Sequence, residues 1–115
     1  MANEGSQQLY DQAVIYLQQH YMDARLNRLT VAAALNCSSR QLSRAFEGRS
    51  HTLTSAIRLI RLHKGRELLL RKKNWSIKKV AETLHFRNAK HFATRYKQQF
   101  GRTPSEERRL VNKNR

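Results

Sequence analysis

Hydrophobic and small residues recur in the same order in two stretches of the chain, residues 26–46 and 75–96. Each stretch has a short run with helical spacing, a break, and then a second helical run. The stretches superpose at an offset of 49 residues before the break and 50 after it, so the second turn is one residue longer. This order predicts two copies of a helix-turn-helix motif.

Polar residues with helix-capping side chains lie at the matching helix starts. The predicted caps of the first helices are Asn27 and Ser76, and those of the second helices are Ser38 or Ser39, and Asn88. At the breaks stand Asn36 and His85, which tolerate a left-handed backbone better than most residues other than glycine. Capping, small, apolar and break positions in one repeated order favour a duplication over chance.

Three further helices are expected outside the two motifs. The first runs from Leu9 to about Ala24, where apolar residues recur at spacings of three and four. A long linking helix, capped at Thr52, runs to about Arg71, and Gly65 within it indicates close packing. Thr103, Pro104 and Glu106 form a helix-start signal for a last helix to about Leu110.

These elements predict an all-α fold of about seven helices, with two helix-turn-helix units joined by a long linking helix. Residues 1–8 are expected to be disordered and residues 111–115 to be frayed. The first unit would span residues 9–51, with its helix-turn-helix at 27–47. The linking helix and a basic connector would span 52–73, and the second unit 74–110, with its helix-turn-helix at 76–99.

The charge of the chain indicates a polyanionic partner. The sequence has 23 Lys and Arg against 8 Asp and Glu, for a net charge of +15. Residues 25–103 carry 19 of the basic residues and three acids, whereas residues 1–24 carry three acids and no Lys or Arg. The charge therefore belongs to the body of the fold, which favours nucleic acid first and an anionic membrane surface second.

Several functions are disfavoured by what the sequence lacks. Cys37 is the only cysteine, so there is no disulfide framework or cysteine-based zinc site, and its match to Phe86 predicts a buried core position. The five histidines show no metal-ligand spacing, and no catalytic set is recognisable. We expect no enzyme activity, metal or cofactor. No apolar run is long enough to span a bilayer, and no secretory signal is present.

Two segments carry a family resemblance: RLHKGRELL at 61–69 and FATRYKQQFGRTPS at 92–105. With the duplicated motif, they make the chain similar to the DNA-binding domain of AraC/XylS transcription regulators, and specifically to the short stand-alone members. The resemblance implies two recognition helices reading adjacent major grooves of promoter DNA, activation through contacts with RNA polymerase, and a location in the bacterial cytoplasm with the nucleoid. The chain departs from the family where His85 replaces a usual Gly and Gly65 a usual Ala.

Helical spacing puts Arg40, Ser43 and Arg44 on one face of the first recognition helix, where the family has base-contacting positions. An arginine fork suits guanine, because it donates to O6 and N7 together. The predicted base-contacting residues are Ser39, Arg40, Ser43, Arg44, Lys90, His91 and Thr94. The predicted phosphate-contacting residues are Ser38, Arg49, Ser76, Lys78, Lys79, Arg87, Asn88, Arg95 and Lys97. Of the latter, Lys78 and Lys79 lie in a first helical turn, where a nearby phosphate would offset their repulsion by the helix dipole.

The leading hypothesis is a sequence-specific DNA-binding transcription regulator, an activator that acts as a monomer on an asymmetric site. Because the second recognition helix is poorer in hydrogen-bonding side chains, the first unit should supply more base discrimination and the second more anchoring. Two alternatives remain open: a protein-interaction module that blocks a related regulator, and a sequence-independent basic nucleic-acid binder. The second alternative predicts binding that weakens steeply with salt and does not survive competitor DNA.

Overall fold

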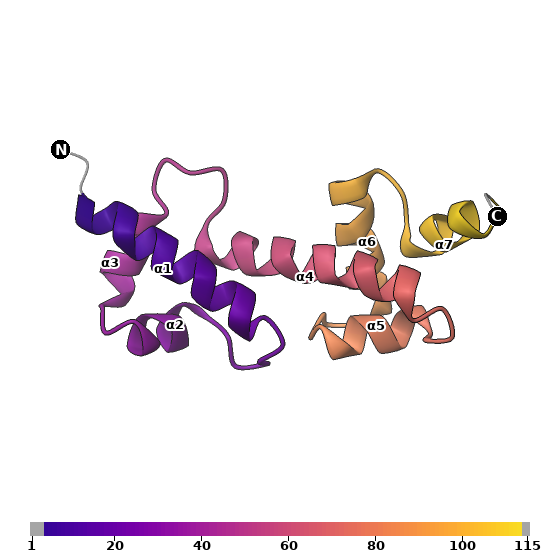
Figure 1. Ribbon diagram of the computed structural model, residues 1–115, viewed down its shortest axis with the longest axis horizontal. Coiled ribbons are helices and arrows are strands. Elements are labelled where there is room, and N and C mark those ends of the chain that lie inside the picture. The colour runs from indigo at the N-terminus through magenta and orange to yellow at the C-terminus, as the bar shows by residue number, and fades with distance from the viewer. Residues whose placement is uncertain (1–3, 114–115) are drawn as a thin grey trace. The chain divides into compact units, whose positions relative to one another are not determined.

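The computed structural model describes residues 4–113, and within them the chain forms seven helices and no strand (Figure 1). The helices are α1 (Glu4–His20), α2 (Arg28–Ala34), α3 (Ser39–Ala45), α4 (Leu53–Arg71), α5 (Ile77–Thr83), α6 (Ala89–Phe100) and α7 (Pro104–Lys113). The all-α prediction with two helix-turn-helix motifs and a long linking helix is confirmed. The chain divides into two compact units, Met1–Ile60 and Arg61–Arg115, so α4 contributes its first part to one unit and its remainder to the other.

Helix α1 begins earlier than the sequence pattern indicated. Residues 4–8, predicted to be disordered, are helical, while residues 1–3 of that segment lie outside the described residues. The first turns are held by Gln7, whose Nε2 donates to Asp11 at 2.9 Å and whose Oε1 accepts from Arg49 at 2.7 Å. The helix also ends at His20 and not near Ala24, because the chain turns where the Asp23 amide donates to the His20 carbonyl.

Helix α7 extends to Lys113 and not to Leu110, so residues 111–113 are not frayed, and 114–115 lie outside the described residues. Its start follows the prediction, since Glu106 accepts from the Thr103 amide at 2.9 Å and Thr103 accepts from the Glu106 amide at 3.1 Å. The extension is supported by Arg108, which donates to the carbonyls of Leu69 and Lys72. Such contacts between distant segments do not appear in local sequence signals.

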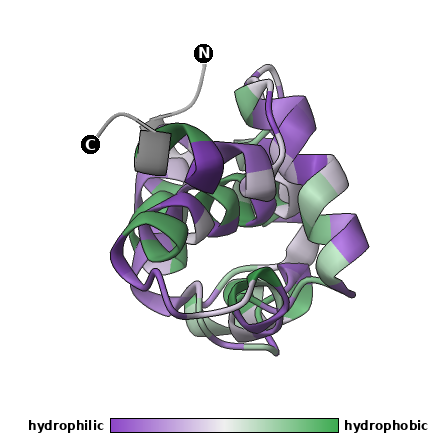
Figure 2. Cartoon of the chain, turned by 90° about the vertical axis from the view of Figure 1, so that its right-hand side faces the viewer, coloured by the Kyte–Doolittle hydropathy of each residue, from purple (hydrophilic) through white to green (hydrophobic). Residues whose placement is uncertain are grey.

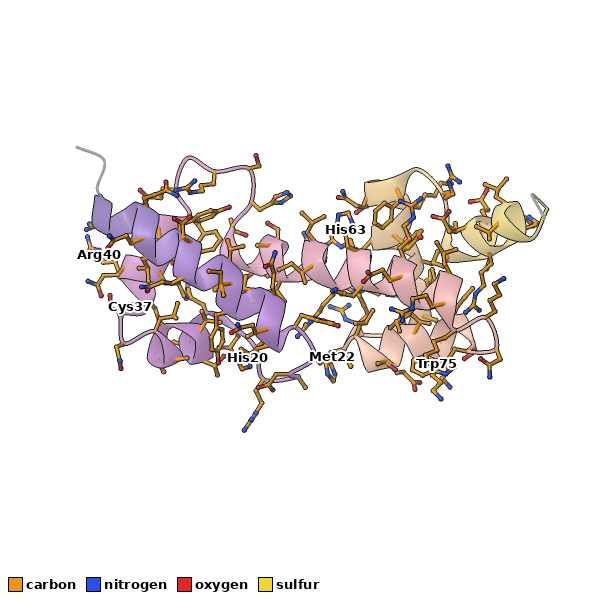
Figure 3. The ribbon with its side chains drawn as sticks, viewed as in Figure 1. His20, Met22, Cys37, Arg40, His63 and Trp75 are labelled. Atoms are coloured by element: carbon orange, nitrogen blue, oxygen red, sulfur yellow. The ribbon has the colours of Figure 1, made fainter. Side chains whose placement is uncertain are left out.

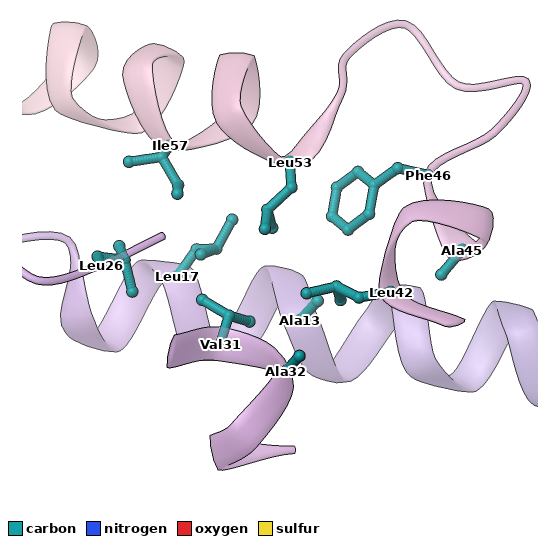
Figure 4. Packing of buried hydrophobic residues seen from close by; sticks show 10 residues of the cluster. All are labelled: Ala13, Leu17, Leu26, Val31, Ala32, Leu42, Ala45, Phe46, Leu53 and Ile57. Carbon is teal, nitrogen blue, oxygen red and sulfur yellow. The ribbon is translucent and has the colours of Figure 1, made fainter. Parts of the chain in front are cut away.

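The core of the first unit is apolar and draws on α1, α2, α3 and the start of α4 (Figure 4). Ala32, one of the small residues that recur in the two motifs, is buried within it. Hydrophobic and hydrophilic residues are interspersed along the helices (Figure 2). The buried residues of this cluster are Ala13, Leu17, Leu26, Val31, Ala32, Leu42, Ala45, Phe46, Leu53 and Ile57.

The second unit has an apolar core with one buried charge. Leu62, Leu69, Val80, Ala81, Leu84, Phe92 and Tyr96 are all buried. A Cβ atom placed on Gly65 would lie 2.9 Å from two ring carbons of Phe92, which confirms the predicted close packing at this glycine. Glu107, only 3% exposed, accepts a hydrogen bond from the Tyr96 hydroxyl and pairs with two arginines of the same unit.

Candidate nucleic-acid interface

The turn between α2 and α3 is built from the capping and break residues that the sequence singled out. Asn27 caps α2 in a reciprocal capping box with Thr30, and Ser38 caps α3 in the same way with Gln41. Ser38 is therefore the cap, and Ser39 is the first helical residue. Asn36 has a φ of 55°, in the left-handed region, as the break required. These local contacts fix the direction in which α3 leaves the turn.

The outward face of α3 is centred on Arg40 and Arg44 (Arg40 is labelled in Figure 3). Both side chains are exposed, and among the described residues neither guanidinium has a hydrogen-bonding or ionic partner. Ser39 and Ser43 are half-buried and lie at the edge of this face. Ser43 lines a recess of about 350 Å³ together with Arg28 and Thr52. The four predicted base-contacting residues of α3 thus share one side of the helix, with the two arginines most accessible.

The second motif is arranged in the same way. Ser76 caps α5 and accepts from the Lys79 amide at 2.9 Å, while Asn88 caps α6 and accepts from the His91 amide at 2.7 Å. His85, with a φ of 62°, occupies the left-handed position of the turn. The turn between α5 and α6 is one residue longer than that between α2 and α3, as predicted.

On α6, Lys90 and Thr94 are exposed on the outward face, and Lys97 lies beside them. The Thr94 hydroxyl donates to the Lys90 carbonyl at 3.0 Å, so it is left mainly as an acceptor. His91, predicted to contact bases, is half-buried at the edge of this face. The centre of its ring lies 6.0 Å from the centre of the Phe86 ring. Lys90 and Thr94 are therefore the two exposed side chains among the predicted base-contacting residues of the second motif.

The predicted phosphate-contacting residues differ in how far their side chains are already engaged. Arg87 is exposed in the turn and makes no ion pair or hydrogen bond among the described residues. Lys78 pairs with Glu82 at 3.9 Å, and the Lys79 ammonium lies 4.3 Å from the centre of the Trp75 ring. These local partners offset part of the helix-dipole penalty, so a phosphate is not needed to explain either lysine. Arg95 makes a long contact of 3.5 Å with Gln98.

Arg49 is the most constrained of the predicted phosphate-contacting residues. Its guanidinium lies 3.6 Å from the centre of the Tyr10 ring, donates to Gln7 at 2.7 Å and donates to the Ala45 carbonyl at 3.3 Å. This arginine therefore ties α1 to the end of α3. Its side chain lies apart from the face that carries Arg40, and a cation–π contact of this kind contributes about 0.5–2 kcal/mol.

Three exposed side chains beside these sites were missed by the sequence reasoning. Arg28 lines the recess that contains Ser43, and Gln41 stands on α3 next to Arg40. Gln98 follows Lys90 and Thr94 at spacings of four residues. That periodicity could have identified Gln98, and the spacing from Ser38 could have identified Gln41 as a capping-box residue. Arg28 carries no sequence signal beyond its charge.

The remaining chemistry of the described residues is limited. The sequence predicted a buried core position for Cys37, but the residue is half-buried, because it packs against the edge of the first unit's core and not inside it. Burial raises the pKa of its thiol. No group of three His, Cys, Asp or Glu side chains in residues 4–113 could hold a metal ion. Over the same residues, no helix is both long and apolar enough to cross a membrane.

Comparisons with known proteins agree with this geometry. A family model described as a helix-turn-helix domain matches residues 31–110. A solved transcriptional regulator from Chromobacterium violaceum, described among AraC-type DNA-binding domain-containing proteins, is 29% identical, with a TM-score of 0.81 over 92% of this chain and 94% of that chain.

Two further solved structures are similar. The C-terminal domain of AraT, a response regulator from Geobacillus stearothermophilus, is 28% identical, with a TM-score of 0.77 over 89% of this chain and 84% of that chain. A probable AraC family regulator from Rhodopseudomonas palustris is 25% identical, with a TM-score of 0.81 over 90% and 96% of the two chains. None of the curated protein sequences compared with the chain matches it significantly.

Proposed function

Because the chain belongs to the family of AraC-type helix-turn-helix DNA-binding domains of transcription regulators, we propose that it places α3 and α6 in adjacent major grooves of a promoter site. The observation that carries this proposal is the pair of exposed arginines on α3 that make no ion pair or hydrogen bond through their guanidinium groups within residues 4–113. Arg49 and Arg66 have stacking or ionic contacts within the protein, whereas Arg40 and Arg44 have none among the described residues and are open to bases.

The two motifs would read their half-sites with different chemistry. Arg40 and Arg44 can each donate two hydrogen bonds to a guanine edge. The corresponding side chains of α6, Lys90 and Thr94, offer a point charge and an acceptor. The first unit would therefore supply most of the base discrimination and the second most of the phosphate anchoring. Two unlike half-sites are suited to a monomer on an asymmetric site.

In vitro selection of duplexes from a random pool tests this proposal directly. We expect an enriched site with two conserved blocks about 10 base pairs apart, one helical turn, and with guanine in the block read by α3. Binding to that site should survive excess competitor DNA at physiological salt. A pool that shows no enrichment, with binding that collapses as salt rises, would instead support the sequence-independent binder. Analytical ultracentrifugation of the complex would test the one-to-one stoichiometry.

We further propose that the bound protein activates transcription by contacting RNA polymerase. Support comes from the family and from α1, which contains no Lys or Arg and is thus suited to contacts other than DNA. The test is reconstituted transcription from a promoter that carries the selected site. Increased transcript yield is expected, and specific binding without any increase would refute activation while leaving the DNA-binding proposal intact.

A further inference from the structure

The first unit contains a cavity of about 510 Å³ between α1, the loop after α3 and the start of α4. Val14, Phe46 and Ala56 contribute apolar surface to its wall, and Arg49 and His51 contribute basic groups. Pockets that hold small molecules commonly have volumes of about 300–1,000 Å³, with a mainly apolar lining and a few polar groups. The size and lining of this cavity therefore fit a small organic ligand.

The internal duplication shows what fills the corresponding place in the second unit. Ala13 and Leu17 of α1 are buried in the way that Gly65 and Leu69 of α4 are, at an offset of 52 residues. The capping boxes of α4 and α7 begin at Thr52 and Thr103, an offset of 51. The recognition helices are related by an offset of 50. By these three offsets, the cavity-lining residues of the first unit have counterparts in the second: Val14 matches Arg66, Phe46 matches Tyr96, His51 matches Arg102, and Ala56 matches Glu107.

In the second unit this place is occupied by a carboxylate and an aromatic ring. Glu107 is 3% exposed and is bound by Arg66 at 3.2 Å, Arg102 at 3.5 Å and the Tyr96 hydroxyl at 2.8 Å. The Phe100 ring lies beside them, with its centre 4.6 Å from that of Tyr96 and 5.3 Å from the Arg66 guanidinium carbon. In the second unit, side chains of the protein itself thus fill this place: an acid, an aromatic ring and two cations.

The first unit lacks the acid, and its ring and basic groups come from other positions. Its ring is that of Tyr10, whose centre lies 5.0 Å from that of Phe46 and 3.6 Å from the Arg49 guanidinium carbon. At the positions of Arg66 and Glu107 the first unit has Val14 and Ala56. Their shorter side chains leave space unfilled, and this space is the cavity. The position of Phe100, counted from the recognition helix, is Ser50, which also lines the cavity. Arg49 and His51 remain as basic groups at this site.

We propose that this cavity binds a small aromatic carboxylate. The ring would contact the apolar wall of the cavity at Val14, Phe46 and Ala56. The carboxylate would take the place of Glu107 and pair with Arg49 and His51. Arg49 is held in advance by Tyr10 and Gln7, which lowers the entropy lost on binding, and its planar guanidinium matches a carboxylate.

The site lies against the end of the first recognition helix. Arg49 donates to the carbonyl of Ala45, the last residue of α3, and Phe46 is the C-cap of that helix. A ligand that draws on Arg49 would therefore change the end of α3, and by linkage DNA and ligand would alter each other's affinity. This consequence rests on the proposed DNA-binding function, whereas binding of the carboxylate does not.

The probe we choose is 3-phenylpropionate, which joins a phenyl ring to a carboxylate, with the neutral 3-phenylpropanamide as its matched partner. Titrations would be followed by backbone amide chemical shifts of the full chain without DNA. Saturable shifts confined to residues around 10–18 and 46–60 are expected, with the amide at least tenfold weaker. Equal affinity for both probes, shifts spread over the basic surfaces of both units, or no saturation would overturn the proposal.

Three variants probe the site independently. Ala56→Glu supplies an internal carboxylate as in the second unit, and Ser50→Phe supplies a ring, so each should weaken 3-phenylpropionate binding at least tenfold. His51→Gln changes a residue in an exposed loop and should weaken 3-phenylpropionate binding severalfold. If the other two variants do not fold, this variant alone tests the assignment. The control Arg109→Ala removes an exposed positive charge from α7 and should leave binding unchanged. Unchanged affinity in the folded site variants would refute the assignment.

A second titration separates this site from the proposed function. The affinity for the selected duplex would be measured by fluorescence anisotropy with and without saturating 3-phenylpropionate. A severalfold change that disappears in Ser50→Phe is expected. If the probe binds at the cavity and DNA affinity does not change, the site stands and its link to α3 is refuted.

Discussion

The Tyr96 hydroxyl donates a 2.8 Å hydrogen bond to the buried carboxylate of Glu107, joining α6 to α7. Arg66 of α4 and Arg102 complete the surroundings of that carboxylate. Burial is the main cause that raises the pKa of Tyr96, so the phenol stays protonated and remains a donor throughout the ordinary pH range. One acidic residue therefore connects three helices of the second unit in a strongly basic chain.

Removing that hydroxyl should destabilise the protein. Tyr96→Phe keeps the ring and leaves Glu107 short of one hydrogen bond, so we expect a loss of about 2 kcal/mol in the free energy of unfolding. Urea denaturation would measure it. The matched control is Tyr16→Phe, since the Tyr16 ring stacks on His20 and its hydroxyl has no hydrogen bond among the described residues. Equal effects of the two substitutions would show that the bond to Glu107 adds nothing.

Gly65 illustrates how a glycine can be required inside a helix. A Cβ there would lie 2.9 Å from the fully buried Phe92 ring and 3.2 Å from a methyl carbon of Leu84. Alanine would gain about 1 kcal/mol in helix propensity. Overpacking a rigid core costs about 1–3 kcal/mol, so Gly65→Ala should be destabilising by about 1 kcal/mol overall.

A double-mutant cycle would test whether the clash with Phe92 causes the destabilisation expected for Gly65→Ala. The first unit combines Ala13 with Leu42 in its core, where the second has Gly65 with Phe92 (Figure 4). Phe92→Leu should therefore remove the clash, so that adding Gly65→Ala to Phe92→Leu becomes neutral or stabilising. Thermal unfolding of the four proteins measures the coupling. Additive effects would mean that Phe92 is not the obstacle.

The break residue of the first turn also allows a specific expectation. Asn36 is exposed and has a φ of 55°, a conformation that costs an L-residue about 1–2 kcal/mol and glycine almost nothing. Asparagine is among the residues that tolerate it. Asn36→Gly should leave stability within about 0.5 kcal/mol, whereas Asn36→Ala should lower it by about 1 kcal/mol. Urea unfolding curves that rank alanine above glycine would contradict this account.

The parts of the fold predictable from sequence are those specified by local chemistry. The caps at Asn27, Ser76 and Asn88 and the left-handed breaks could be predicted because each depends on residues within about four positions. The exposed face of α3 follows from helical periodicity in the same way. For this reason the starts of α2, α5 and α6 follow from the sequence.

Contacts between distant segments could not be predicted in this way. The bond between Gln7 and Arg49 joins residues 42 apart, and it both lengthens α1 and engages an arginine that was predicted to contact phosphate. The burial of Glu107 depends on α4, α6 and α7 together. Charge alone did not distinguish Arg40, which is unpartnered, from Arg49, because the difference lies in tertiary packing.

The start of α7 should contribute a pH-dependent stability. The Thr103 amide donates to Glu106, and this hydrogen bond holds the pKa of that carboxyl below its ordinary value of 4.5. A carboxyl whose pKa is lower in the folded state than in the unfolded state stabilises the fold at pH values above its unfolded-state pKa. This stabilisation is lost as the pH falls through the folded-state pKa. Glu106→Gln keeps an acceptor without the charge. Thermal unfolding should show the wild type more stable at neutral pH and the two proteins converging below pH 4.5; a constant difference would contradict the linkage.

The last prediction separates base reading from phosphate anchoring. Arg40→Ala should weaken binding to the selected duplex by about 1–3 kcal/mol and relax its preference for guanine, because the outward guanidinium is lost from α3. Arg87→Ala should weaken selected and scrambled duplexes alike and reduce the salt slope by about 1, as expected for one phosphate contact. Arg71→Ala, exposed on α4 outside both motifs, is the control for loss of charge. Anisotropy titrations at several salt concentrations give both quantities. If Arg40→Ala reduces affinity uniformly across sequences, α3 anchors the protein and base reading must be assigned elsewhere.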